Sequence, residues 1–256
     1  MGNLLRMDLY RMTKAKSFWV CLGTAFGLAL LQTPFLWGLT LLSRLFSSEA
    51  AAFPKTAMLS AIISDPFPLL NGMLCLLSAC SFFYADVENG YIKNIAGQMP
   101  KRGFTVLSKF LAVVPHTLLF MAAGLIGNLI GTVIFQRIVS DGEVMQGVLT
   151  FVMRLLLIQS ICAILLLVTV SFQNKSLGTV LAVLMGLGLL GLIYSLIDSG
   201  INQVFPNKGF VITDYMPDQL LNRPKPPVLD SIIVSAVTTA IFLPLSIRVF
   251  DRRDVK

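Results

Sequence analysis

Few side chains in this sequence have the chemistry of catalysis or metal binding, and none falls into a familiar active-site pattern. The P-loop pattern GxxxxGK[ST] is absent, and so are the zinc-protease pattern HExxH and the serine-hydrolase pattern GxSxG. The four cysteines form no CxxC pair, and there is a single histidine, which argues against a zinc site. We therefore expect no catalytic residue, no metal site and no cofactor in this chain.

Three polar side chains inside apolar blocks are candidates for function, namely His116, Arg154 and Gln159. His116 is either a proton relay or a neutral ring hydrogen-bonded to a neighbouring helix. The lack of a carboxylate partner within the apolar blocks favours the neutral ring. Arg154 either reaches the outer lipid headgroups or faces a polar cavity together with Gln159. Its place near the outer end of its block favours the headgroups.

The composition indicates an integral membrane protein. Hydrophobic residues make up 55% of the 256 residues and charged residues only 13%, whereas soluble domains carry about 25% charged residues. The apolar residues gather in continuous blocks of about 20, the length of a membrane-spanning helix. Transmembrane β-strands would show shorter alternating segments. The sequence therefore predicts an all-α membrane protein.

The chain forms one transmembrane domain, 1–256, with six predicted spans. An amphipathic helix over 1–17 precedes the first span, which is too long for the apolar part of a cleaved signal peptide. Asp65 and Pro66 end a short helix predicted over 56–64 in the first outer loop. The predicted spans are 18–42, 67–83, 110–135, 148–172, 177–197 and 228–249.

The distribution of basic residues predicts the orientation. Thirteen of the 20 lysines and arginines lie in 1–17, 84–109, 173–176 and 248–256, against six in the other three loops. Cytoplasmic segments carry the excess of basic residues, so both termini are predicted to be cytoplasmic. The net charge of +7 is explained by this asymmetry, and we expect the lipid bilayer, not nucleic acid, as the partner of these residues.

Segment 84–109 is the most informative loop. Ile92 and Ile95 fall at helical spacing and the stretch is broken by Gly97 and Pro100, which predicts a short amphipathic helix on the cytoplasmic face. Such a helix either lies on lipid or docks into a soluble partner. The residues proposed for that docking surface are Asp86, Glu88, Asn89, Gly90, Tyr91, Ile92, Lys93, Lys101 and Arg102.

Glycines within the spans predict close helix packing. Gly186, Gly188 and Gly191 spell GxGxxG, but they lie inside a predicted span, where a dinucleotide fingerprint has no strand before it. Gly23/Gly27 and Gly127/Gly131 have the GxxxG spacing of close helix contacts. The spacing leaves open whether these contacts lie within one subunit or between two.

Taken together, these features resemble the permease subunit of a type-two ABC exporter, over the whole chain at the level of topology. The basic N-terminal helix and the tail RVFDRRDVK are similar to those of that family. The stretch from Glu88 to Asn94 resembles the family's E-x-x-x-G-T-I-x-N loop, although its spacing is one residue shorter or it differs at the Thr position. Tyr215 and Pro217 resemble a Tyr-x-Pro element before the last span. Permeases of lantibiotic export and immunity are the most similar members.

The resemblance implies a partnership and a place of action. Two permeases, identical or related, would pair in a bacterial plasma membrane with two separate ATPase subunits, which bind ATP and Mg²⁺. Segment 84–109 would be the coupling loop that contacts the ATPase. The substrate would be a hydrophobic or amphipathic molecule such as an antimicrobial peptide or a drug.

Two other classes of function remain. A stand-alone membrane immunity protein would bind a peptide without transporting it, and would need no ATPase. A membrane enzyme acting on lipid would need clustered acids or histidine near the interface, and this sequence has only scattered ones.

Overall fold

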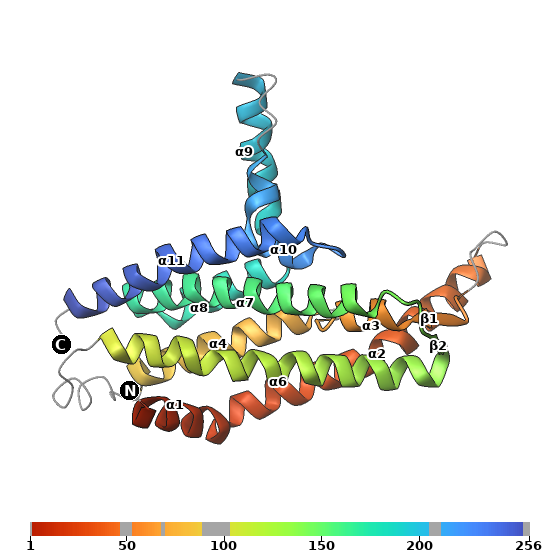
Figure 1. The fold of residues 1–256 in the computed structure, drawn as a ribbon, viewed down its shortest axis with the longest axis horizontal. Coiled ribbons are helices and arrows are strands. Elements are labelled where there is room, and N and C mark those ends of the chain that lie inside the picture. Colours follow the sequence, from red (N-terminus) through yellow and green to blue (C-terminus); the bar gives the residue numbers. More distant parts are fainter. Residues whose placement is uncertain (1, 47–52, 68–69, 89–102, 205–210, 253–256) are drawn as a thin grey trace.

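The described part of the chain is an elongated bundle of helices (Figure 1). The structure is a computed structural model and describes residues 2–46, 53–67, 70–88, 103–204 and 211–252. In chain order the elements are α1 (Gly2–Lys14), α2 (Lys16–Phe46), β1 (Thr56–Met58), α3 (Leu59–Ser64), α4 (Asn71–Glu88), α6 (Gly103–Phe135), β2 (Arg137–Val139), α7 (Val144–Phe172), α8 (Lys175–Gly186), α9 (Leu190–Val204), the 3-10 helix η1 (Ile212–Tyr215), α10 (Pro217–Asn222) and α11 (Val228–Arg252).

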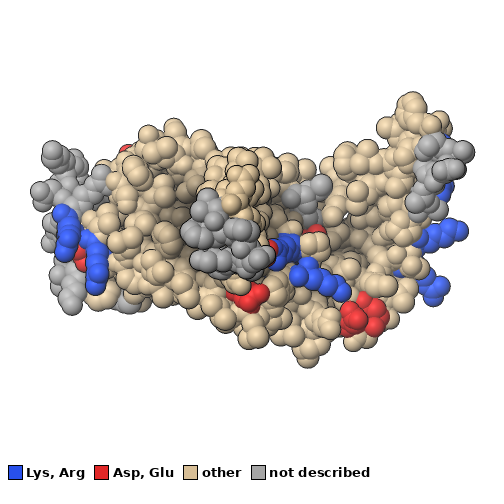
Figure 2. Space-filling view, turned by 90° about the horizontal axis from the view of Figure 1, so that it is seen from above, with Lys and Arg blue, Asp and Glu red and all other residues tan. Residues whose placement is uncertain are grey.

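The helices confirm a multi-pass membrane protein. Of the described helices, α2, α6, α7 and α11 are each long and apolar enough to cross a bilayer, and α8 with α9 makes a fifth if that bent pair is one span. The predicted span 67–83 corresponds to α4, whose apolar part, Asn71–Ala85, is shorter than the other candidates. Six separate spans therefore stay a prediction. The surface seen in Figure 2 is largely uncharged, with charged side chains at the two ends and a small group near the middle.

The predicted fifth span, 177–197, is not one straight helix. It is two helices, α8 and α9, that meet at 72°. Gly188 has a φ of 68° and ends α8 in a Schellman motif, in which the Leu189 N–H bonds to the Leu184 carbonyl and the Gly188 N–H to the Met185 carbonyl. The break was not predicted, because the hydropathy of a sequence carries no information about backbone dihedral angles. As a result α9 projects sideways from the bundle (Figure 1).

The two loops that precede α4 and α7 are joined to each other. The helix predicted over 56–64 is only partly correct, since Thr56–Met58 is strand β1 and pairs in parallel with β2. Beyond the strands, the Ser60 hydroxyl donates a hydrogen bond to the Asp141 carboxylate. This hydrogen bond lowers the pKa of Asp141 below its ordinary value. The loops thus form one unit that closes this end of the bundle.

The opposite end holds both described termini and the turn between α7 and α8 (Figure 1). The N-terminal helix α1 is separate from α2, as Ala15 lies between them. Its Asp8 is buried and accepts a 2.5 Å hydrogen bond from the hydroxyl of Ser108 on α6. Two ends on one side agree with the predicted topology, while the assignment of that side to the cytoplasm remains a prediction.

Helices α2 and α6 pack closely at the second GxxxG pair. A Cβ added at Gly127 would lie 2.8 Å from the Phe26 carbonyl oxygen, and one at Gly131 would lie 2.5 Å from the Leu30 carbonyl oxygen. No atom of the described chain lies within 4 Å of such a Cβ at Gly23 or Gly27. The Gly127/Gly131 pair therefore serves packing within the subunit, and the Gly23/Gly27 face is open.

We expect Gly131→Ala to destabilise the protein by about 1–3 kcal/mol, because the added methyl group forces α2 away from α6. Gly38→Ala, on α2 and outside the Gly23/Gly27 face, is the matched control. It adds the same methyl group to a helix that has free space there, and alanine is the better helix former. The measurement is the fraction folded during titration with SDS. Equal stability of the two variants would contradict the close α2–α6 packing.

Candidate functional site

A cavity of about 780 Å³ lies beside the joined loops that precede α4 and α7. Its wall is built from α3, the start of α4, the first half of α7, the end of α8, and the chain from α10 to α11. The lining is mixed, with apolar side chains such as Phe67, Leu149 and Val228 and polar ones such as Ser64, Thr150 and Asn222. A cavity of this size matches the range of small-molecule sites, roughly 300–1,000 Å³.

Arg154 is the buried charge of this cavity. Only 6% of the residue is exposed. Its Nη1 lies 2.7 Å from Oδ1 of Asp65, and its Nη2 donates a 3.1 Å hydrogen bond to the carbonyl of Arg223. The expectation that Arg154 reaches the outer headgroups is therefore wrong. The physical reason is that the segment after α3 and the segment after α10 fold over this turn of α7 and supply its partners.

Gln159 does not share the cavity with Arg154. Its side-chain amide donates to the Thr117 hydroxyl at 3.0 Å and to the Val113 carbonyl at 3.3 Å, both on α6. Arg154 therefore lines a cavity of mixed character, and Gln159, which was predicted to share it, does not. Gln159 instead cross-links α7 to α6 inside the core.

His116 lies in the same core layer, fully buried. Its Nε2 is 3.0 Å from the hydroxyl of Ser78 on α4, and its ring lies against Phe18 and Phe120. If the His116 ring is neutral, it needs a hydrogen bond to a neighbouring helix, and the contact with Ser78 is of that kind. No group of three metal-ligating side chains comes together within the described ranges.

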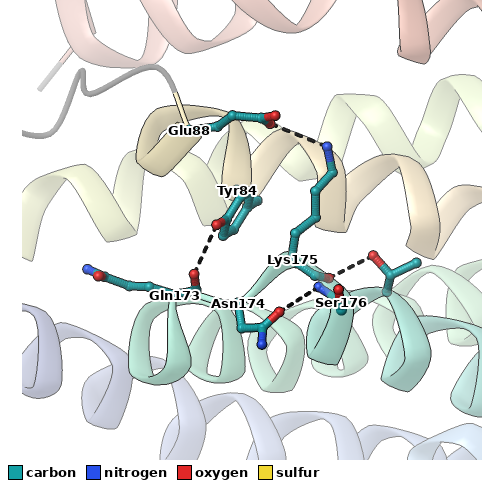
Figure 3. Close-up of polar contacts among 7 residues, drawn as sticks. Tyr84, Glu88, Gln173, Asn174, Lys175 and Ser176 are labelled. Carbon is teal, nitrogen blue, oxygen red and sulfur yellow. Dashed lines mark hydrogen bonds and ion pairs between the residues drawn. The ribbon is translucent and has the colours of Figure 1, made fainter.

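At the other end of α4, polar contacts join this helix to the turn between α7 and α8 (Figure 3). The Tyr84 hydroxyl donates to the Gln173 carbonyl at 3.0 Å, and Lys175 Nζ lies 3.3 Å from Glu88 Oε2. Gln173 adopts a left-handed conformation, and Asn174 caps α8 by accepting from the Ser176 N–H. We call this group the α4–α8 corner. Sequence reasoning selected Glu88 but missed Lys175, whose partner is distant in the chain.

Most of the predicted coupling loop lies outside the described residues. This applies to Asn89, Gly90, Tyr91, Ile92, Lys93, Lys101 and Arg102, and to the side chain of Asp86. The helices on either side are firmly held. Lys109 of α6 donates a 2.8 Å hydrogen bond to the Phe83 carbonyl in the last turns of α4, where a cation also suits the helix dipole.

Helices α4 and α8 connect this corner to the cavity. Helix α4 ends at the corner and α8 starts there. At their other ends, Gly72 of α4 and Gly186 of α8 line the cavity. A Cβ at Gly186 would lie 2.5 Å from the Cα of Met73, and one at Gly178 would lie 2.7 Å from Cys80 Sγ. The two helices are therefore in close contact along their length.

The predicted outer-loop element, Tyr215 and Pro217, lies at the junction of η1 and α10. Tyr215 is 45% exposed at the end of η1, whereas Pro217 is buried as the first residue of α10. Neither lines the cavity. Their contribution is indirect, since α10 carries Leu221 and Asn222 into the cavity wall. In the same helix Asp218 is fully buried, and this burial raises its pKa.

Comparison with known proteins adds no relative: no family model matches the chain, and no curated protein matches it.

Two ion pairs of this structure should differ sharply in their effect on stability. We expect Arg154→Gln to cost about 1–3 kcal/mol, because Asp65 and the Arg223 carbonyl lose a charged hydrogen-bond donor at a part-buried site. Lys175→Gln removes the half-exposed pair with Glu88, and should change stability by less than about 1 kcal/mol. Unfolding by SDS measures both. A large effect of Lys175→Gln would mean that the α4–α8 corner has a structural role.

Proposed function

We propose that this chain is the membrane-spanning permease subunit of an ATP-driven ABC transporter. The observation that carries the proposal is the close α4–α8 pair, which joins the α4–α8 corner at one end of the bundle to the cavity at the other. The predicted coupling loop follows directly from Glu88, the last residue of α4. A displacement of that loop therefore acts on the end of a helix whose other end lines the cavity.

The mechanism follows from this geometry. A separate ATPase, with ATP and Mg²⁺ bound, closes on nucleotide binding and displaces the segment between Glu88 at the end of α4 and Gly103 at the start of α6. The contacts of Tyr84 and Glu88 with the α7–α8 turn make α4 and α8 move together. Because Gly186 is packed on Met73, the cavity wall moves with them. The chain supplies the path for the substrate, and the partner supplies the energy.

A second copy of this chain, or a related permease, completes the proposed transporter. The open Gly23/Gly27 face of α2 supports this part of the proposal, because GxxxG faces allow two membrane helices to approach closely. With α4 and the α8–α9 pair counted as spans, each subunit has six. The basic end of the bundle faces the cytoplasm of a bacterial cell, and the cavity faces the outer leaflet.

The substrate of the proposed transporter is a hydrophobic or amphipathic molecule. The mixed lining of the outer cavity supports this class. The main alternative is a stand-alone immunity or binding protein, which would use the same cavity without an ATPase.

The test is purification of the tagged protein from its native membrane in a mild detergent, followed by mass spectrometry. We expect a soluble P-loop ATPase in roughly equal amount with the wild-type chain. A clean protein without an ATPase, in a preparation where other membrane complexes survive, would overturn the transporter in favour of the binding protein.

The double variant Glu88→Ala, Gly90→Pro tests the coupling loop. We expect it to insert normally but to lose stimulation of the ATPase, because the loop no longer transmits its movement to α4. Asp230→Ala, in the first turn of α11 and outside the cavity lining, is the matched control and should couple as the wild type does. Full coupling in the double variant would remove this loop from the mechanism.

A further inference from the structure

We propose that the outer cavity binds an amphiphile through an anionic group, a carboxylate or a phosphate, held by Arg154. This inference deepens the proposed function and rests on it only in taking the bound molecule to be the transported one. It begins from a buried cation that lines a cavity large enough for a small ligand.

The hydrogen bonds of Arg154 are incomplete. Its Nη1 meets Asp65 and its Nη2 meets the Arg223 carbonyl, but its buried Nε has no hydrogen-bond partner in the described part of the chain. A buried donor without a partner is costly. A planar guanidinium pairs best with a carboxylate or phosphate that accepts two parallel hydrogen bonds. The single contact with Asp65 does not use that capacity.

Asp65 is a replaceable partner. Its side chain is 38% exposed, against 7% for Arg154, so the carboxylate can return to water when another anion takes its place. Arg154 cannot, because it stays within the wall of the cavity. Exchange of one carboxylate for another on the same guanidinium costs little electrostatic energy. The Arg154–Asp65 ion pair is therefore the form of the site without ligand, and an anionic ligand binds by displacing the Asp65 carboxylate.

The remaining charges of the lining favour an anion near Arg154. Lys225 also lines the cavity, two residues from the Arg223 carbonyl that contacts Arg154. The acidic residue Glu143 occupies the position just before α7, roughly 16 Å along the helix from Arg154. An anionic headgroup thus meets positive charge at Arg154. Its apolar body can lie along Phe67, Leu149 and Val228.

The experiment measures binding to the purified chain in nanodiscs of neutral phosphatidylcholine. The probes are octyl phosphate, octanoate and octyltrimethylammonium, which share a chain and differ in the headgroup. We expect the two anions to raise the melting temperature and the cation to leave it unchanged. Stabilisation by the cation equal to that by the anions would overturn the proposal.

Variants separate a ligand site from a structural ion pair. Asp65→Asn removes the competing carboxylate and should tighten binding of octyl phosphate about tenfold, the effect of one charge-assisted hydrogen bond. Arg154→Gln should abolish binding. If that variant does not fold, Arg154→Lys keeps the charge without the planar fork and should weaken binding about tenfold. Weaker binding in Asp65→Asn would assign the pair to structure alone and overturn the proposal.

Two further probes identify the source of the anion. Lysophosphatidic acid represents a lipid headgroup, and an apolar tetrapeptide with a free C-terminus represents a peptide carboxylate, with its C-terminal amide as control. Binding of either anion supports the site, and binding of neither overturns it. No ATPase is present in this assay. Failure to bind therefore leaves the proposed transporter intact, and absence of an ATPase in the native membrane leaves an anion site intact.

Discussion

The close contact between α4 and α8 is the constraint on which the other functional features depend. Lipid gives no hydrophobic reason for two apolar helices to associate, so their packing depends on close approach at small residues. At Gly186 the backbone of α8 approaches the Cα of Met73 too closely for any side chain. This contact fixes the wall of the cavity at one end of the bundle and the α4–α8 corner at the other. Gly188, two residues later, then turns the chain away from the bundle.

Arg154 gives the cavity its chemical character. It is held by the Asp65 side chain and the Arg223 carbonyl, which come from the segments after α3 and after α10, so the charge depends on these segments as well as on α7. A buried arginine is expensive unless it is paired, and these two segments supply its partners. The β1–β2 pairing and the hydrogen bond from Ser60 to Asp141 hold one of those segments in place. The Arg154 guanidinium needs the partners in these segments, and the segments are in turn held in place by their hydrogen bonds to Arg154.

Several helices were predicted well from the sequence, because a continuous apolar block of about 20 residues is the pattern of a helix that crosses a membrane. The predicted fourth span, 148–172, ends where α7 ends, and the sixth starts where α11 starts. The break at Gly188 was missed because it depends on one positive φ within an apolar block. The partner of Arg154 was missed because Asp65 is 89 residues away in the chain. The predicted coupling residues from Asn89 to Arg102 lie outside the described structure, so their role stays a prediction.

In the proposed mechanism, movement of the ATPase at the end of the bundle near Glu88 reaches the cavity through α4 and α8. The direct measurement is the rate of thiol labelling of a cysteine placed at Gln146, which is exposed and lines the cavity, with the ATPase bound and with or without a non-hydrolysable ATP analogue. A cysteine at Leu192, exposed on α9, serves as control. The account predicts a severalfold change in the labelling rate at Gln146 and none at Leu192. An unchanged rate at Gln146, with the nucleotide-loaded ATPase still bound, would contradict it.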